Sequence, residues 1–274
     1  MFDKKLTAAV KERAKQLGAD LVGVASADRF EAAPAGHKPE DLLPGAKSVV
    51  MMAKRMLSST FVTPNPRVYV LRYLQLRSRF QDVGYDMSCF LEDQGHWAIN
   101  FPSTAPQDVS WETKMLVADF SYKHAAQLAG LGEIGMNQLL ITPEFGPRVW
   151  LMGVITTAEL SPDPLLTDKL CTREKCNICV ENCPEGALSA EGIEKRKCIR
   201  RPGEFGISNL LSHIRNIMEE KDPDKRRKLI NGPTTWALWM RMHYGGPPSR
   251  CNACIALCPI GWKGPRPAIA STSR

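Results

Sequence analysis

Cysteine is the residue type in this sequence whose number and spacing point most directly to chemistry. The chain has nine cysteines in 274 residues, and eight of them follow residue 170. The spacing Cys-x2-Cys-x3-Cys-Pro occurs twice, at 176–184 and at 251–259, with an offset of 75 residues. Disulfides are rare in reducing compartments, whereas thiolates bind iron–sulfur clusters and soft metal ions. The eight later cysteines therefore predict metal centres.

The repeated motif predicts two [4Fe–4S] clusters that exchange one ligand. In two-cluster ferredoxins the cysteine that precedes proline ligates the other cluster, and not the cluster bound by its neighbours. Applied to this chain, the rule assigns four ligands to a first cluster: Cys171, Cys176, Cys179 and Cys258. It assigns four ligands to a second cluster: Cys183, Cys198, Cys251 and Cys254.

Two zinc sites are the alternative, because zinc knuckles also use Cys-x2-Cys. Zinc does not require the x3-Cys-Pro extension, and the paired copies would then be a coincidence. Two features depart from the ferredoxin pattern: the four-residue gap between Cys171 and Cys176, and the inserted segment 199–250. The pattern as a whole favours iron–sulfur clusters.

The elements that must position these cysteines follow from the hydrophobic pattern. Apolar residues recur at helical spacing over 4–17 and 67–94, with Gly84 as a candidate break in the second helix. Further helices are expected at 122–129 and 207–221. Short apolar runs predict strands at 21–25, 48–53, 97–101, 115–120, 139–142 and 149–157.

This order of elements predicts two domains. Residues 1–160 form an α+β domain in this interpretation, and the Pro- and Asp-rich stretch 161–168 is the linker. Residues 161–274 form a ferredoxin-like domain with two clusters, into which the helical segment 199–250 is inserted.

A glycine-rich segment precedes the cysteine motifs and carries a family resemblance. Residues 129–148 read AGLGEIGMNQLLITPEFGPR. This segment resembles the corresponding stretch of epoxyqueuosine reductases and of corrinoid-dependent reductive dehalogenases. The sequences GADLVGVASADRF (18–30) and LLPGAKSVVMMA (42–53) also resemble the start of epoxyqueuosine reductases. The resemblance implies a nitroreductase-like α+β domain that binds cobalamin, and clusters that deliver electrons to its cobalt.

The resemblance also implies cofactor contacts and a proton donor. Glycines let the backbone approach a flat macrocycle closely, although a helix C-cap and tight turn need glycine equally. The expected corrinoid contacts are Gly130, Gly132, Gly135 and Asn137. Reductive cleavage consumes protons, and the family uses an aspartate or a tyrosine as donor. The candidates for this catalytic role are Asp119, Tyr122 and His124.

The function expected from these features is a cytoplasmic corrinoid and iron–sulfur reductase that acts on a small molecule, as reductive dehalogenases do. A ferredoxin- or flavodoxin-type protein would donate the electrons, and the net charge of +7 favours an acidic partner. No membrane association is expected, because the sequence has no long apolar run and no twin-arginine signal.

Two other functions stay open. The chain could be an electron-transfer protein that reduces the corrinoid of a partner protein. It could also be a tRNA-modifying enzyme of the epoxyqueuosine reductase type. The tRNA hypothesis ranks last, because the helical-repeat domain that such enzymes carry is not expected in the short stretch after Cys258. Nucleic acid is therefore not the main partner in this interpretation.

Overall fold

The structure is a computed structural model, and it describes residues 2–63, 65–101, 118–173, 175–200, 207–244 and 251–262. The first part of the chain contains α1 (Lys4–Gln16), β1 (Leu21–Ser26), the 3-10 helix η1 (Ala27–Phe30), α2 (Pro39–Leu42), β2 (Ser48–Arg55), α3 (Ser59–Val62), α4 (Pro66–Asp93), β3 (Ala98–Asn100), α5 (Tyr122–Leu128), β4 (Glu133–Ile134), β5 (Leu140–Ile141) and β6 (Val149–Thr156). The second part contains α6 (Ile178–Glu181), β7 (Leu188–Ser189), β8 (Gly192–Ile193), α7 (Lys195–Arg200), α8 (Ile207–Glu219), α9 (Pro223–Ile230), α10 (Pro233–Tyr244) and α11 (Ala253–Ala256).

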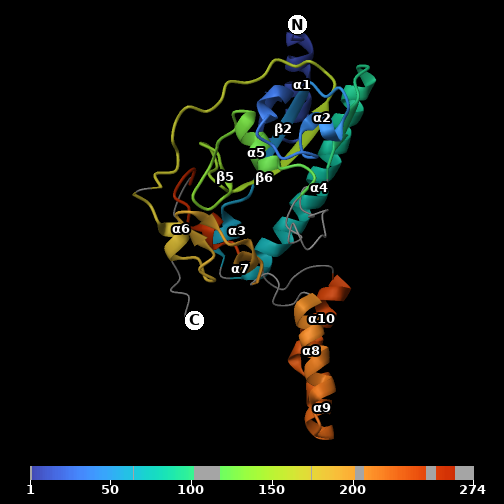
Figure 1. Cartoon of the computed structure of the whole chain (residues 1–274), viewed down its shortest axis with the longest axis vertical. Coiled ribbons are helices and arrows are strands. Elements are labelled where there is room, and N and C mark those ends of the chain that lie inside the picture. Colours follow the sequence, from blue (N-terminus) through green and yellow to red (C-terminus); the bar gives the residue numbers. More distant parts are fainter. Residues whose placement is uncertain are drawn as a thin grey trace.

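An antiparallel sheet with the strand order β1-β2-β6-β3 forms the centre of the first part (Figure 1). On β6, Met152 lies against Gly84 of α4, and Gly153 lies against Tyr122 of α5. Successive residues of a strand point to opposite faces, so α4 and α5 cover opposite faces of the sheet. Positions 48–53 of β2 are all buried, as expected for a strand that is covered on both sides.

The mixture of helices and strands predicted from the sequence is confirmed. Helix α4 differs from the prediction, because it continues through Gly84 without a break. A Cβ at Gly84 would lie 2.7 Å from the Met152 sulfur and 2.9 Å from the Asn100 amide nitrogen. Glycine is present there because the helix packs closely on the sheet. Residues 115–117 of the strand predicted at 115–120 lie outside the described residues, and residues 118–120 do not form a strand.

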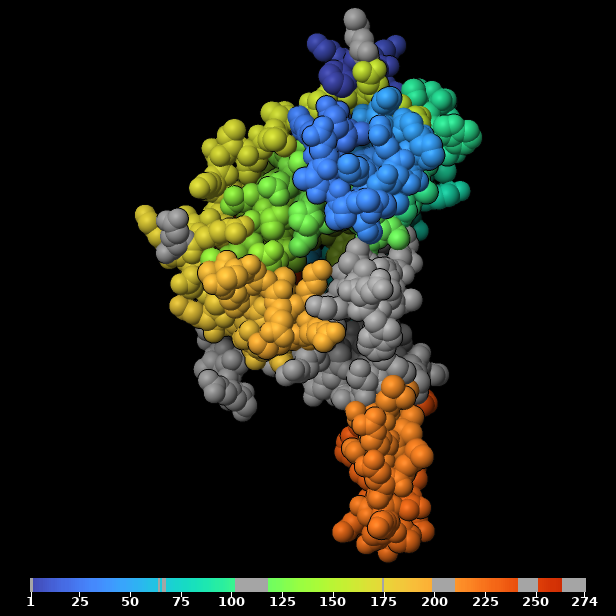
Figure 2. Space-filling view, viewed as in Figure 1, coloured from blue at the N-terminus to red at the C-terminus, as the bar shows by residue number. Residues whose placement is uncertain are grey.

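The cysteine-rich part has little regular structure. The short helices α6 and α11 each contain the middle cysteine of one repeat, Cys179 and Cys254, and the two helices are in contact with one another. Helices α8, α9 and α10 extend away from the rest of the described molecule, as Figures 1 and 2 show. Their exposed apolar side chains include Leu211, Ile214, Met218, Trp236, Trp239 and Met240.

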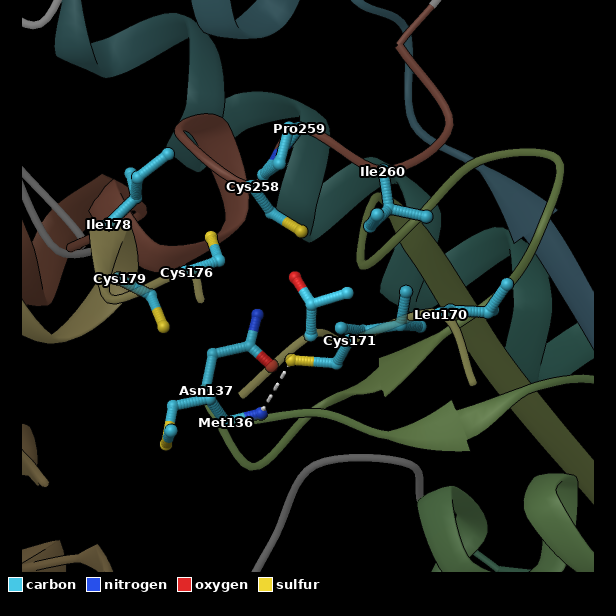
Figure 3. Close-up of a pocket in the computed structure, with 12 residues that line it drawn as sticks. Met136, Asn137, Leu170, Cys171, Cys176, Ile178, Cys179, Cys258, Pro259 and Ile260 are labelled. Carbon is cyan, nitrogen blue, oxygen red and sulfur yellow. Dashed lines mark hydrogen bonds between the residues drawn. The ribbon is translucent and has the colours of Figure 1, made fainter. Parts of the chain in front are cut away.

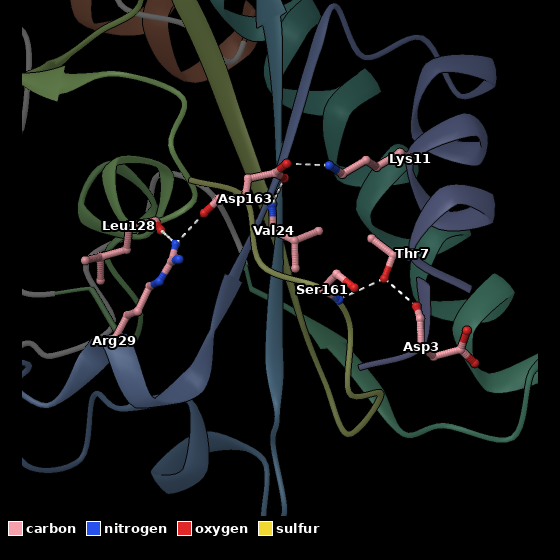
Figure 4. A network of polar contacts seen from close by, with 8 residues as sticks. All are labelled: Asp3, Thr7, Lys11, Val24, Arg29, Leu128, Ser161 and Asp163. Carbon is pink, nitrogen blue, oxygen red and sulfur yellow. Dashed lines mark hydrogen bonds and ion pairs between the residues drawn. The ribbon is translucent and has the colours of Figure 1, made fainter. Parts of the chain in front are cut away.

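The segment predicted as a linker is held against the first part of the chain (Figure 4). The backbone N–H of Asp163 donates to the Val24 carbonyl, and its carboxylate accepts from the Val24 N–H and from Lys11. Arg29 donates to the carbonyl oxygens of Asp163 and Leu128. The start of the linker is therefore fixed by hydrogen bonds, and the division into two domains stays a prediction.

Membrane-spanning helices are not found among the residues that the structure describes: none of these helices combines the length and the apolar character needed to cross a bilayer.

Candidate metal centre

Four cysteine side chains line a single pocket in the cysteine-rich part (Figure 3). They come from both repeats: Cys171, Cys176, Cys179 and Cys258. The remaining lining is mostly apolar, from Met136, Ile141, Leu170, Ile178, Pro259 and Ile260. An apolar surrounding excludes water from a metal centre and lowers the local dielectric constant. The structure thus brings together the four residues assigned to the first cluster.

The other four cysteines also interact with one another. Burial raises the pKa of the Cys198 thiol, and the neighbouring Cys251 and Cys183 thiols raise it further. Burial likewise raises the pKa of Cys254, and the neighbouring thiols of Cys251, Cys198, Cys179 and Cys183 raise it further. The four residues assigned to the second cluster thus lie close enough to influence one another's pKa, and Cys179 of the first set also acts on Cys254.

Backbone N–H groups point at cysteine sulfurs in both groups. The N–H of Met136 lies 3.4 Å from Cys171 Sγ, and the N–H of Ala187 lies 3.2 Å from Cys183 Sγ. Such bonds stabilise the negative charge of cluster sulfurs and influence the reduction potential. The carboxylate of Glu133 accepts a hydrogen bond from the N–H of Cys171, which fixes the first cysteine of the set.

The chemistry of these thiols fits a bound cluster. Burial raises the pKa of the Cys179 thiol to about 11, with further increases from Cys171, Cys258 and Cys176. Thiolates in an apolar pocket repel one another, so the four cysteines are protonated thiols without a metal. Iron ions that replace these protons stabilise the thiolate form. Among the described residues, no three or more His, Cys, Asp or Glu side chains form a group suited to one metal ion. A four-iron cluster is larger than one ion and keeps its cysteine ligands farther apart.

Two residues before β6 connect the first part of the chain to the second cysteine repeat, and neither role was predicted from the sequence. The Asn137 amide donates to the Cys254 carbonyl at 3.2 Å. The Arg148 guanidinium donates to the carbonyl oxygens of Ile255, Cys258 and Ile260. Asn137 was predicted as a corrinoid contact, whereas Arg148 at the end of ITPEFGPR was given no role.

The glycines predicted to contact a corrinoid lie against the protein itself. The absent Cβ of Gly130, where φ is +76°, would meet the Pro164 carbonyl oxygen. A Cβ at Gly132 would meet the Ile141 carbonyl oxygen, and one at Gly135 would meet the Ile141 side chain. Packing within the chain accounts for these three glycines. They offer no open surface to a macrocycle on the side where the Cβ would be.

The three candidate proton donors differ in their surroundings. The Tyr122 hydroxyl donates to the Phe101 carbonyl at 2.6 Å and accepts from the Phe101 N–H at 2.9 Å. Burial raises the pKa of Tyr122 to about 12. His124 has Nδ1 2.7 Å from Ser121 Oγ, and burial together with Lys123 lowers its pKa.

Asp119 is half-buried at the start of the segment that leads to α5. Its backbone carbonyl bonds with His37 Nδ1 at 2.9 Å. Within the described ranges, no hydrogen bond or ion pair engages the carboxylate itself, which leaves it able to exchange a proton with a ligand. A helix-capping bond was the alternative for this residue, and α5 has no side-chain cap.

Epoxyqueuosine reductases are relatives that align with most of the sequence. The protein from Bacillus cereus is 26% identical over 267 residues, which cover 89% of this chain and 62% of the relative. The protein from Gloeobacter violaceus is 28% identical, covering 94% of this chain and 77% of the relative. The tetrachloroethene reductive dehalogenase of Desulfitobacterium hafniense is 29% identical over 66% of this chain and 27% of its own length. This chain thus spans less than two thirds of the Bacillus cereus relative.

Solved structures with the same fold come from the same two kinds of protein. An epoxyqueuosine reductase in complex with an epoxyqueuosine-modified stem loop of tyrosine tRNA has a TM-score of 0.57 at 19% identity, covering 97% of this chain and 68% of that one. The Bacillus subtilis enzyme, with its catalytic aspartate loop swung out of the active site, has a TM-score of 0.58 at 20% identity, covering 97% and 67%. A reductive dehalogenase with B12-dependent chemistry has a TM-score of 0.56 at 17% identity, covering 86% and 36%. At these identities the likeness concerns the fold alone.

These comparisons correct the expected function. The prediction of a dehalogenase-like reductase of small molecules is wrong, because epoxyqueuosine reductases align over 89–94% of the chain and dehalogenases over 66%. The expected class of oxidoreductase agrees with both kinds of relative. No protein-family model matches the sequence. The resemblance of this chain to the superfamily of epoxyqueuosine reductases and reductive dehalogenases is confirmed by sequence and by fold.

Proposed function

We propose that this chain is an iron–sulfur reductase of the epoxyqueuosine reductase type, which reduces an epoxide carried by a modified tRNA nucleoside. The observation that carries this proposal is the alignment with epoxyqueuosine reductases over 89% of the chain and more. Four of the eight later cysteines, one of them from the distant second repeat, line one pocket. The same fold occurs in an epoxyqueuosine reductase bound to a modified tRNA stem loop.

In this proposal the cysteine-rich part, residues 161–274, delivers electrons to a catalytic domain formed by residues 1–160. The first cluster is bound by Cys171, Cys176, Cys179 and Cys258, and the second by Cys183, Cys198, Cys251 and Cys254. Bound clusters supply one-electron transfer in both directions. The chain contributes an apolar pocket, the N–H groups of Met136 and Ala187, and the buried charge of Arg148. An acidic ferredoxin- or flavodoxin-type donor fits the net charge of +7.

A corrinoid is assigned no residues in this proposal. Gly130, Gly132 and Gly135 pack against the chain on the side where a Cβ would lie, and the Asn137 amide donates to the Cys254 carbonyl. These four residues therefore do not form a cradle for a macrocycle. No step of the reaction is derived through such a group.

Asp119 is the residue we propose as proton donor. Removing an epoxide oxygen as water consumes two electrons and two protons, so an acid must lie near that oxygen. A half-buried carboxylate without a partner among the described residues suits this task better than the engaged hydroxyl of Tyr122. The Bacillus subtilis epoxyqueuosine reductase has a catalytic loop that contains an aspartate, and this loop is swung out of the active site in its structure.

The test uses the chain purified without oxygen and loaded with iron and sulfide. A tRNA stem loop that carries epoxyqueuosine is incubated with the protein and a low-potential viologen donor. Nucleoside mass spectrometry then measures the loss of one oxygen atom from the modified base. We expect about eight irons per chain, turnover with the modified stem loop, and loss of turnover in Asp119→Asn.

A mock incubation without donor and an unmodified stem loop are the controls. A chain that holds both clusters, accepts electrons from the viologen and leaves the modified nucleoside unchanged would overturn the proposed function. Binding of the stem loop that weakens steeply with salt would support phosphate contacts.

A further inference from the structure

Arg148 is buried at the junction between the two parts of the chain. It follows the turn at Gly146 and precedes β6, and its side chain is 2% exposed. The guanidinium donates to the Cys258 carbonyl at 3.0 Å, to the Ile255 carbonyl at 3.2 Å and to the Ile260 carbonyl. One arginine therefore holds three carbonyl oxygens of the loop that contains the last cysteine.

The packing around Arg148 fixes its position closely. The guanidinium carbon lies 4.5 Å from the centre of the Trp262 ring, which is within the range of a cation–π contact. A Cβ at Gly146 would meet the Ile260 carbonyl oxygen, and a Cβ at Gly261 would meet the Gly146 backbone nitrogen. The two loops thus touch backbone to backbone, and the arginine side chain has no room to turn away.

The charge of Arg148 has no carboxylate partner among the residues that the structure describes. Burial lowers the pKa of Arg148 to about 10, so the guanidinium is still protonated at neutral pH. The Cys258 sulfur is the one charged group that acts in the opposite direction. Burial of a cation without an anion nearby is strongly unfavourable. The carbonyl of Cys258, a residue assigned to the first cluster, accepts from this guanidinium, so the positive charge lies beside the proposed cluster site.

We infer that Arg148 is a positioning residue and the fixed positive charge of the first cluster, and that it raises the reduction potential of that cluster. The inference rests on the proposed function, since it needs a cluster at Cys171, Cys176, Cys179 and Cys258. A cluster held by four thiolates is negative and becomes more negative on reduction. A buried guanidinium next to one of its ligands stabilises the reduced form more than the oxidised form.

The test is a redox titration of the reconstituted full chain, followed by electron paramagnetic resonance. Arg148→Gln removes the charge, and Arg148→Lys keeps the charge but loses the planar fork that reaches three carbonyls. Arg173→Gln is the matched control, because Arg173 also donates to a backbone carbonyl near a cluster cysteine but is exposed. Iron content is measured on every variant.

We expect Arg148→Gln to move the midpoint of one cluster to a more negative potential and to leave the other unchanged. Arg148→Lys should stay close to the parent chain, and Arg173→Gln should shift neither cluster. If Arg148→Gln loses a cluster, the midpoint potential of Arg148→Lys is compared with that of the parent chain. A much more negative midpoint in Arg148→Lys then overturns the inference, because this variant keeps the positive charge. Equal midpoints in the parent, Arg148→Gln and Arg148→Lys overturn it as well.

The proposed function and the role of Arg148 are refuted by different results. A parent chain that takes up no iron refutes the proposed clusters, and with them the proposed function. A parent chain with both clusters and potentials that do not respond to Arg148 refutes the role of the arginine alone.

Discussion

The carboxylate of Asp163 joins the segment that leads to the first cysteine to the N-terminal sheet. Its Oδ2 accepts the Val24 N–H at 2.8 Å, and its Oδ1 pairs with Lys11 Nζ at 2.5 Å. Val24 is fully buried, so Asp163→Ala leaves its N–H without a partner. An unsatisfied buried donor costs about 1–3 kcal/mol. Loss of the partly exposed ion pair adds about 0–1 kcal/mol.

We therefore expect Asp163→Ala to lower the free energy of unfolding by about 1–4 kcal/mol. Asp163→Asn keeps an oxygen for the Val24 N–H and loses the ion pair, so its cost should stay below about 1 kcal/mol. Lys11→Met is the matched control, because it removes the same ion pair and leaves the carboxylate in place.

Thermal unfolding followed by circular dichroism measures these differences. For a chain of this size 1 kcal/mol corresponds to roughly 2–4 °C, so Asp163→Ala should unfold about 2–16 °C below the parent. Asp163→Asn and Lys11→Met should each lie within about 4 °C of the parent. Equal unfolding temperatures for Asp163→Ala and Asp163→Asn would refute the reasoning, because the hydrogen bond to Val24 would then contribute nothing.

Four further predictions concern the candidate site. Cys183→Ala should abolish the second cluster and spare the first, and a paramagnetic resonance spectrum that lacks only the first would contradict the exchange of ligands. Tyr122→Phe leaves both backbone groups of Phe101 unpaired, so it should lower the free energy of unfolding by about 1–3 kcal/mol and leave turnover intact. Asp119→Asn should do the reverse, with turnover reduced roughly 10²-fold or more and an unchanged unfolding temperature. The lowered pKa of His124 makes the folded state take up its proton less readily than the unfolded chain, so stability should fall as the pH drops below about 6.5, and His124→Gln should flatten this dependence in thermal unfolding between pH 7 and 5.

The regular elements of the first part could be predicted from local sequence. The apolar residues of 4–17 recur at helical spacing and form the buried face of α1. The continuous apolar run of 48–53 forms β2, which is buried on both faces. Gly84 was misjudged, because sequence does not reveal that a sheet lies against that face of the helix. The same limit applies to the glycines after α5. Their conformational freedom is visible in the sequence, whereas the atoms that fill the space beside them come from Ile141 and Pro164.

The candidate metal centre was predictable where a motif repeats and unpredictable where a contact is long-range. The repeated spacing identifies the cysteines as cluster ligands, and the general rule for two-cluster ferredoxins assigns each cysteine to one of two clusters. Nothing in the residues around Arg148 indicates that its side chain meets carbonyl oxygens 107 to 112 positions away. The mistaken function had another cause. The glycine-rich segment resembles two kinds of reductase. A resemblance in one segment does not show which kind aligns over more of the chain.

In the proposed function, the presence of Cys258 in the pocket of Cys171, Cys176 and Cys179 would determine when a cluster can be inserted. Cys258 follows Cys179 by 79 positions, so the ribosome has released the first three thiols long before the fourth emerges. During that interval the nascent chain presents an incomplete set of ligands that is open to oxygen and to stray metal ions. Loading is therefore a step that follows synthesis of both repeats. A cell that makes this protein gains from iron–sulfur delivery that recognises the finished chain.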